Sequence, residues 1–181
     1  MTSPNLAHRL LSADFLTLVY RVVGRMMVPA VGMLAMLNDP ASSFMEVVDA
    51  KLAPIHMPTK LVGEYEILDL VKSGLFAVCL ARREDAGTQV PASSTHKAVK
   101  YPIRVATPVY QLEGTLEWSG RFDFEAVMHA GSAAFMPLYN ATLTAILFPQ
   151  LRIQSPAVLF NRRQVDLLAV ITDDKQVLSI A

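Results

Sequence analysis

The chain has four histidines and one cysteine, residue types that often bind metals or act in catalysis, and their spacing forms no metal-binding motif. The histidines are His8, His56, His96 and His129. None belongs to a His-x-x-x-His pair, and Cys79, being alone, makes no Cys-x-x-Cys motif. Cys79 lies in an apolar run, which is typical of a small core side chain and not of a nucleophile. We therefore expect no metal and no cofactor.

Glu125 and His129 have a spacing suited to acid/base chemistry. Residues Arg121 to Ala130 are predicted to form a helix, in which side chains four positions apart are neighbours. The pair could act as a coupled acid and base, although a surface hydrogen bond on an amphipathic helix explains the same spacing. No phosphate-binding glycine pattern and no Gly-x-Ser-x-Gly elbow accompanies it. The sequence favours a protein that is not an enzyme.

Four further residues are candidates for binding. Arg162 and Arg163 form a basic pair in a predicted turn, where they could bind an anion, pair with a partner's carboxylate or face solvent. Asp49 and Asn140 occupy matched places in two similar segments. They could be a retained polar ligand, or they could satisfy local backbone groups where a strand bends.

Two of these candidates, Asp49 and Asn140, lie in an internal repeat. Residues Phe135–Pro149 share six of fifteen residues with Phe44–Pro58, which lies 91 positions earlier, whereas about one identity is expected by chance. Tyr20 and Tyr110 also match; they could stack a nucleic-acid base, but their apolar surroundings favour the core. At a spacing of 90, the matched residues are Thr17, Val19, Tyr20 and Gly24 with Thr107, Val109, Tyr110 and Gly114. The chain is therefore predicted to hold two copies of one small β-rich unit.

The predicted elements follow the same plan in both units. We expect a short N-terminal helix in residues 1–12, a first β-barrel unit in 13–84, a linker in 85–98, a second unit in 99–172 and a tail in 173–181. In the first unit we expect a long strand at Asp14–Val28 bent at Gly24, helical turns in Gly32–Asn38, and strands at Phe44–Ile55, Leu61–Leu70 and Leu75–Ala81. In the second we expect a long strand at Arg104–Trp118, the helix, and strands at Phe135–Phe148, Ile153–Phe160 and Val165–Ile171. Pro137 should lie at an edge or bulge, because proline has no N–H.

Both units resemble the Sm-like small β-barrel family. In that family a bent strand carries Gly-x-Leu, which Gly114-Thr115-Leu116 and Gly24-Arg25-Met26 resemble. A later strand carries a hydrophobic-Met-Asn-hydrophobic core, and then an Asp-Ala or Asn-Ala turn, to which Phe135–Ala141 is similar. The last two strands join through a turn that often holds Arg-Gly, and the segment Val158–Leu168 is similar without the glycine. The resemblance implies two tandem barrels in a mainly β chain.

The same resemblance implies an RNA-base pocket built from an Asp or Asn of one loop and the Arg-Gly of another. Of that pocket the second unit keeps Arg162 and Arg163, while Glu46 and Pro137 stand where the family has asparagine. The second unit also resembles an uncharacterised bacterial family of single-copy β-rich domains, through Thr107–Leu116 and Phe135–Ala141. That family implies no activity.

Composition limits the class of partner. Lys and Arg together number 16, as do Asp and Glu, so the net charge is zero and phosphate-driven nucleic-acid binding is disfavoured. Hydrophobic residues reach 52%, more than a small unit can easily bury, so some of this surface is expected to face a protein partner or a second copy. The apolar stretch Phe15–Leu37 is interrupted by Arg21 and Arg25, and no transmembrane segment or signal peptide is predicted. One cysteine allows no intrachain disulfide, which favours a cytoplasmic location.

Together these features favour a non-enzymatic structural or interaction protein that serves as an accessory or assembly subunit of a larger complex. An RNA-binding Sm-like protein is the first alternative. The second is an enzyme or a small-ligand-binding barrel that uses Glu125 and His129.

Overall fold

The computed structural model describes residues 8–87, 98–129 and 131–172. We call residues 8–87 the first half and 98–172 the second half. The first half consists of β1 (His8–Leu16), β2 (Tyr20–Pro29), α1 (Met33–Leu37), β3 (Phe44–Pro54), β4 (Gly63–Val71), the 3₁₀ turn η1 (Lys72–Gly74), β5 (Ala77–Leu80) and the 3₁₀ turn η2 (Arg83–Ala86). The second half consists of β6 (Ala98–Ala106), β7 (Tyr110–Ser119), α2 (Phe124–His129), β8 (Phe135–Ala145), β9 (Arg152–Asn161), the 3₁₀ turn η3 (Arg162–Gln164) and β10 (Leu167–Val170).

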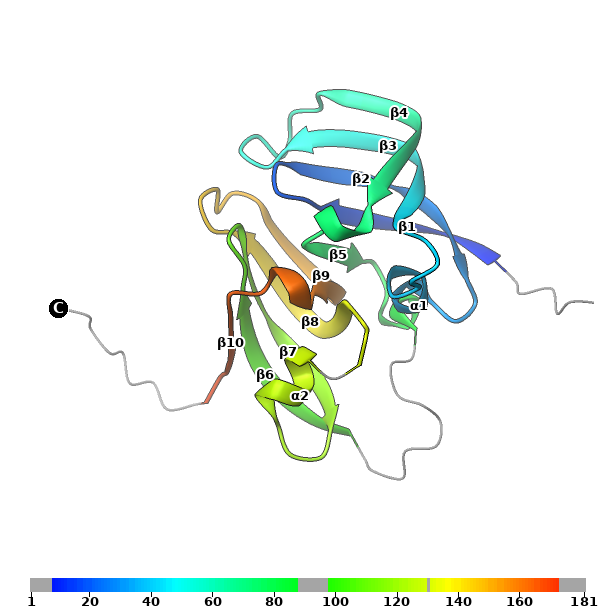
Figure 1. Cartoon of the computed structure of the whole chain (residues 1–181). Coiled ribbons are helices and arrows are strands. Elements are labelled where there is room, and N and C mark those ends of the chain that lie inside the picture. Colours follow the sequence, from blue (N-terminus) through cyan, green and yellow to red (C-terminus); the bar gives the residue numbers. More distant parts are fainter. Residues whose placement is uncertain (1–7, 88–97, 130, 173–181) are drawn as a thin grey trace, which may run out of the picture.

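All these strands belong to one antiparallel sheet with the order β10-β6-β7-β8-β9-β5-β1-β2-β3-β4 (Figure 1). The first half contributes β5-β1-β2-β3-β4 and the second contributes β10-β6-β7-β8-β9, so both halves have the same internal order. The halves meet where β5 pairs with β9. The prediction of a mainly β chain with a short helix in each unit is confirmed.

The predicted barrel closure is not found. In the described residues β4 pairs with β3 alone and β10 pairs with β6 alone, so the sheet has two free edges. The reason is that β5 already has two neighbours. It pairs with β1 on one side and with β9 of the other half on the other side, which leaves it no edge to offer β4.

Glycines bend the second strand of each half, as predicted for Gly24. The register of β2 against β3 shifts between Val23 and Arg25, and that of β7 against β8 shifts between Glu113 and Thr115. A Cβ atom on Gly114 would lie 2.8 Å from Cβ of Ala141 and 2.9 Å from the backbone oxygen of Tyr139. Only glycine allows so close an approach between the two strands. Each half has its own apolar core.

The two cores exchange residues across the β5–β9 pairing. The core of the first half also contains Phe135 and Leu159, and the core of the second half also contains Phe76 and Cys79. Ring contact between Phe76 and Tyr110, with centroids 5.7 Å apart, joins the halves within the second core. The halves therefore share buried surface and do not merely touch at their edges.

Several predicted boundaries were wrong because a threonine turn divides each long strand. The Thr17 hydroxyl accepts a hydrogen bond from the Tyr20 amide (3.0 Å) and donates one to the Tyr20 carbonyl (3.0 Å). Thr107 makes the same pair of bonds with Tyr110, at 2.9 and 3.1 Å. This side-chain turn ends one strand and begins another. The strand predicted at Asp14–Val28 therefore covers the end of β1 and most of β2, and the strand predicted at Arg104–Trp118 covers the end of β6 and most of β7.

The predicted N-terminal helix, linker and tail fall largely on residues 1–7, 88–97 and 173–181, which lie outside the described residues. Where the structure does describe them, it differs from the prediction. His8 begins β1, in which Leu11, Ala13 and Phe15 are buried at the two-residue period of a strand. Arg83–Ala86 forms η2, and Ala98 begins β6.

Pro137 lies where its missing N–H costs little. The pairing of β7 with β8 ends at Tyr139, so at Pro137 the strand β8 has a ladder partner only in β9, at Leu159. Within the described residues, none of the helices has the length and apolar character needed to cross a membrane.

Candidate functional site

The junction between the halves is built from the short strand β5 and the end of β9. Ala77 pairs with Phe160 and Leu80 pairs with Ala157. Every residue of this pairing is buried, from Ala77 to Leu80 on one strand and from Ala157 to Phe160 on the other. The Asn161 amide then donates to the Phe76 carbonyl (2.9 Å), which extends the ladder past the paired residues. The junction is a strand pairing whose side chains are buried on both faces of the sheet.

Polar side chains form further contacts between the two halves around the junction. The Asn161 Nδ2 donates to the Leu75 carbonyl (2.9 Å), and the Tyr110 hydroxyl donates to the Thr17 carbonyl (2.6 Å). Burial raises the pKa of the Tyr110 hydroxyl, so this group stays protonated as a donor. A further contact between the halves comes from Arg83 of η2, whose guanidinium carbon lies 3.8 Å from the centre of the Tyr139 ring. Its guanidinium also donates to the Glu117 carboxylate at 2.6 Å.

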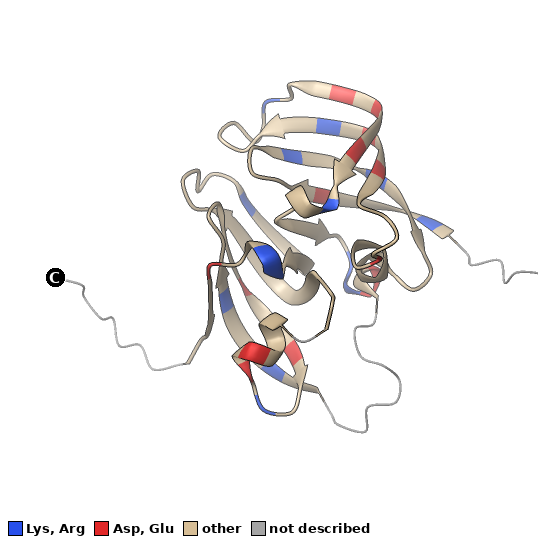
Figure 2. Cartoon of the chain, in the orientation of Figure 1, with Lys and Arg blue, Asp and Glu red and all other residues tan. Residues whose placement is uncertain are grey.

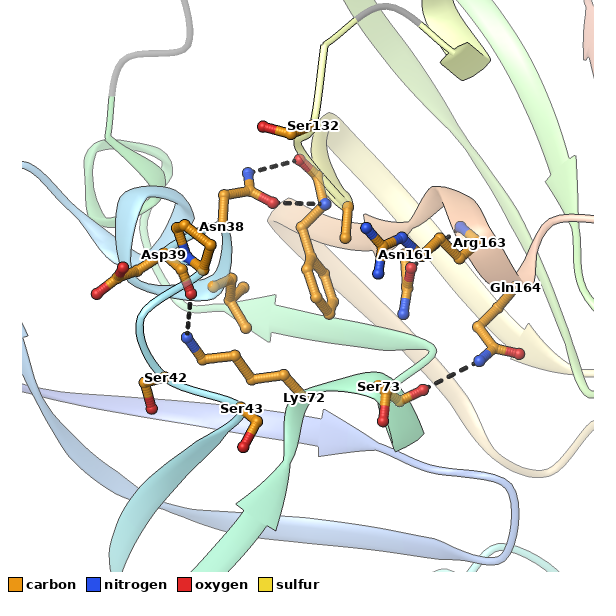
Figure 3. A pocket seen from close by; sticks show the side chains of 14 residues that line it. Asn38, Asp39, Ser42, Ser43, Lys72, Ser73, Ser132, Asn161, Arg163 and Gln164 are labelled. Atoms are coloured by element: carbon orange, nitrogen blue, oxygen red, sulfur yellow. Dashed lines mark hydrogen bonds between the residues drawn. The ribbon is translucent and has the colours of Figure 1, made fainter.

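A pocket of about 440 Å³ opens beside this junction (Figure 3). Its walls come from the loop after α1, from η1, from the start of β8 and from η3. On one wall the Asn38 amide pairs with the Phe135 backbone: its Nδ2 donates to the carbonyl at 2.9 Å and its Oδ1 accepts from the amide at 2.8 Å. On another wall Gln164 Nε2 donates to the Ser73 carbonyl at 3.1 Å. Both halves therefore contribute to one polar pocket.

Lys72 and Arg163 are the cationic side chains of this pocket. Lys72 is only 7% exposed, and its Nζ donates to the backbone carbonyls of Met36 (2.6 Å) and Asp39 (3.2 Å). Burial lowers the pKa of Lys72, and the nearby Asp39 carboxylate raises it in part. Because the Lys72 charge already serves these carbonyls, exposed Arg163 is the cation better placed to meet a ligand.

The predicted basic pair is divided by the fold. Arg162 is 7% exposed, and its guanidinium donates to the Val127 carbonyl at 2.7 Å and also to the Ala133 carbonyl. Burial lowers the pKa of Arg162, and the positive charge of Arg163 adds to this effect. Arg162 thus joins α2 and the segment before β8 to η3, whereas Arg163 is exposed and lines the junction pocket.

Asp49 and Asn140 have the same backbone conformation at matched places. Their φ angles are +50° and +47°, in the left-handed region where Asp and Asn are tolerated better than most residues. Each lies in the third strand of its half, beside the bent glycine strand, and each is exposed. Asp49 also forms an exposed ion pair with Arg25. Neither residue lines the junction pocket, so the fold does not bring them together with Arg163.

Glu125 and His129 both lie on α2, as predicted, and both are exposed. No hydrogen bond or ion pair of the described residues joins the two side chains. His129 lines a hollow of about 470 Å³ next to Arg163, whereas Glu125 does not line it. The geometry supplies no support for a coupled acid/base pair.

Other candidate residues belong to the core or to open surface. Cys79 is 5% exposed, and burial raises the pKa of its thiol, so it remains protonated at neutral pH. Tyr110 is fully buried, but its match Tyr20 is 39% exposed, so the core assignment was wrong for Tyr20. Tyr110 meets the other half at the junction, and Tyr20 faces solvent beside the turn at Thr17. Within the described residues, no three His, Cys, Asp or Glu side chains gather as a metal site.

Sequence reasoning missed Lys72, Asn38 and Asn161 as pocket residues. A signal was present for Lys72, because it stands 90 positions before Arg162 at the same place in the matched 3₁₀ turn. No comparable signal existed for Asn38, whose partner Phe135 is 97 positions away.

The free edges of the sheet are apolar as well as unpaired. On β4, Tyr65, Ile67 and Val71 are 47%, 60% and 59% exposed. On β10, Leu167 and Val170 are 49% and 36% exposed. Along the ribbon of Figure 2, the positions of Lys and Arg and those of Asp and Glu are interspersed in both halves.

Comparison of the chain with protein-family models, with curated proteins and with solved structures found no match.

Proposed function

We propose that this protein is a non-enzymatic interaction protein, made of two Sm-like units that arose by internal duplication, and that it serves as an assembly subunit of a larger complex. The duplication is supported by the repeated strand order, the repeated glycine bend and the repeated left-handed residue at Asp49 and Asn140. Each unit is an Sm-like strand set that does not close on itself: the last strand of the first unit, β5, pairs with β9 of the second, and the last strand of the second unit, β10, keeps a free edge. A single buried cysteine suits a cytoplasmic location.

One observation carries the proposal. The β5–β9 junction joins two units edge to edge, and the corresponding edges β4 and β10 are left with exposed apolar side chains. An unpaired strand edge is a template for further pairing, and most proteins that do not use such an edge protect it. Here β10 carries no charged residue.

The test is the size of the protein, both purified and in native extract. We expect the purified chain to elute above its monomer mass of 19.9 kDa in size exclusion with light scattering, or to enter a larger particle in extract. A particle that contains the chain appears as a band well above 20 kDa in native electrophoresis followed by immunodetection. A monomer in both preparations contradicts the proposal.

A second candidate function is RNA binding, which the junction pocket favours. Its walls include the 3₁₀ turns η1 and η3, and it combines Lys72 and Arg163 with amide and hydroxyl groups suited to a phosphate or a base edge. Binding of a fluorescent oligouridine should be salt-sensitive, and Arg163→Ala should weaken it several-fold. Arg152→Ala is the matched control, because Arg152 is an exposed arginine on β9 that does not line the pocket. The absence of binding at low salt removes this candidate.

A further inference from the structure

We infer that four turns at one end of the sheet form an apolar surface that inserts into the interfacial region of a lipid bilayer. These turns join β1 to β2 (residues 17–19), β3 to β4 (55–62), β6 to β7 (107–109) and β8 to β9 (146–151). We call them together the turn surface. The inference goes beyond the proposed assembly role and does not depend on it.

Within each half, a backbone hydrogen bond joins the two turns. The Ile55 amide of the β3–β4 turn donates to the Val19 carbonyl of the β1–β2 turn at 2.9 Å. In the second half, the Ile146 amide of the β8–β9 turn donates to the Val109 carbonyl of the β6–β7 turn at 2.8 Å. The two turns of each half are therefore held side by side.

Side chains join the turns of one half to those of the other. The Gln150 Nε2 donates to the His56 carbonyl at 3.2 Å, and the rings of His56 and Phe148 have centroids 5.9 Å apart. The Tyr110 hydroxyl, next to the β6–β7 turn, donates to the Thr17 carbonyl at 2.6 Å. With the backbone bonds, these contacts link all four turns into one surface (Figure 1).

Large apolar side chains of this surface are exposed. They are Leu18, Val19, Met57, Leu61, Val62, Ile146 and Leu147. Leu147 is 78% exposed, the highest fraction among the large apolar side chains of the described residues. Turns that face water usually carry glycine, proline, asparagine, aspartate or serine. Aliphatic residues at the tips of neighbouring turns indicate that this end of the sheet meets an apolar environment.

The charges of the turn surface suit lipid headgroups. Lys60 in the β3–β4 turn and Arg152 at the start of β9 are both exposed. The four turns contain no acidic residue. Glu64, the closest carboxylate along the chain, lies opposite Lys51 in the β3–β4 pairing. Long basic side chains beside an apolar tip can bind lipid phosphates while the tip enters the bilayer.

The β6–β7 turn lies at the rim of the inserted surface. Its Val109 is only partly exposed, and the amide of exposed Asp166 donates to the Ala106 carbonyl just before it, at 2.9 Å. A carboxylate at this place stays in water. Insertion is therefore led by Leu18 and Leu147 and is shallow, at the depth of the headgroups and the first acyl carbons.

A bilayer fits this surface better than a protein partner does. Protein interfaces are anchored mainly by Trp, Tyr and Arg side chains that fill pockets. Here the most exposed side chains are aliphatic and stand on separate turns. Tyr20, the aromatic residue beside them, is 39% exposed, and tyrosine is enriched where membranes meet water.

Vesicle flotation of the full chain tests the inference. Wild type should float with phosphatidylcholine vesicles that contain about one-fifth phosphatidylglycerol. Leu147→Glu should lower the partition coefficient by about tenfold or more, because a carboxylate replaces the most exposed apolar tip. Val31→Glu is the matched control, because Val31 is 55% exposed but follows the other end of β2, and it should bind as wild type does. Circular dichroism confirms the fold of both variants.

The headgroup contact has its own variant. Lys60→Gln should weaken binding by about fivefold on vesicles with phosphatidylglycerol, and by less on phosphatidylcholine alone, because each basic residue near the surface adds attraction to anionic lipid. An equal loss on both kinds of vesicle contradicts the placement of Lys60 at the headgroups.

A fluorescent probe reads insertion directly. Cys79 is buried, so Leu147→Cys and Ala41→Cys each provide one accessible thiol for an environment-sensitive dye. Vesicles should shift the emission of the dye at position 147 to the blue, and a quencher on the lipid acyl chain should reduce it. The dye at position 41, in the loop between α1 and β3, should show neither effect.

The inference and the proposed function fail in different ways. A wild-type chain that floats with neither kind of vesicle, equal losses for Leu147→Glu and Val31→Glu, or equal responses of the two dyes overturn the bilayer inference. A chain that does not float but cross-links through position 147 to a protein in extract overturns it too. These outcomes leave the proposed function in place, because size exclusion and native electrophoresis measure assembly without vesicles. A monomer in both preparations that still floats contradicts the proposed function alone.

Discussion

Replacing Asn38 with alanine should loosen the contact between the two halves. The Asn38 amide makes two hydrogen bonds to the backbone of Phe135, a residue 97 positions away in β8 (Figure 3). Alanine removes both bonds and leaves the partly buried N–H and C=O of Phe135 without these partners. Asn38 is the C-cap of α1 at φ −91°, a conformation that alanine also adopts, so no backbone effect obscures the result.

The expected loss can be worked from these two bonds. Each contributes about 0.5–1.5 kcal/mol net, so the free energy of unfolding should fall by about 1–3 kcal/mol. For a chain of this size, each kcal/mol lowers the melting temperature by about 2–4 °C. Asn38→Asp keeps the oxygen that accepts from the Phe135 amide but places a second carboxylate oxygen against the Phe135 carbonyl oxygen, so its loss should be at least as large as that of Asn38→Ala.

Urea denaturation followed by tryptophan fluorescence and circular dichroism measures the effect. Gln154→Ala is the matched control, because Gln154 is an exposed amide on β9 for which the described residues show no side-chain hydrogen bond, and it should change stability by less than about 0.5 kcal/mol. An Asn38→Ala protein as stable as wild type, or no less stable than Gln154→Ala, would refute the reasoning that this amide bridge holds the halves together.

Three further outcomes are expected. Gly114→Ala should destabilise the fold by about 1–3 kcal/mol because its Cβ would lie 2.9 Å from Leu138 Cγ, whereas Gly74→Ala, with open space around it, should be nearly neutral in urea denaturation. Asn140→Val should be about 1–2 kcal/mol less stable than Asn140→Gly, since φ is +47° there; equal stability would contradict a left-handed residue. Burial raises the pKa of the Cys79 thiol, so little thiolate forms at pH 8 and a chromogenic disulfide reagent should react only after denaturant is added. Rapid reaction of the native protein would show an accessible thiolate.

Local sequence signals predicted the bends of the sheet. Glycine at positions 24 and 114 indicated a bend, and both positions coincide with a register shift. For the matched Asp49 and Asn140 the sequence offered two roles, a polar ligand or a group that satisfies the local backbone, and it gave no sign of the positive φ that both residues have. The glycine predictions succeed because conformational preference belongs to a residue and its immediate neighbours.

Other features could not be predicted from the local pattern. Arg162 and Arg163 are adjacent and identical in type, yet one is buried against Val127 and the other is exposed. Tyr20 and Tyr110 occupy matched places, but only Tyr110 lies at the junction and is covered by the other half. In each pair the difference depends on which distant segment packs nearby, and neither residue carries that information.

The sequence alone determined the β-rich class, the internal similarity of the two halves, and the positions of glycine, Asx and turn residues between strands. Periodicity and turn chemistry are local properties, so they can be recognised without the tertiary structure. The tertiary structure alone decided that β5 joins β9, that the cores exchange side chains, and that a polar pocket opens beside the junction. Strand edges pair through backbone N–H and C=O groups that every residue except proline carries in full, so the choice of neighbour is set by the packing of the whole sheet.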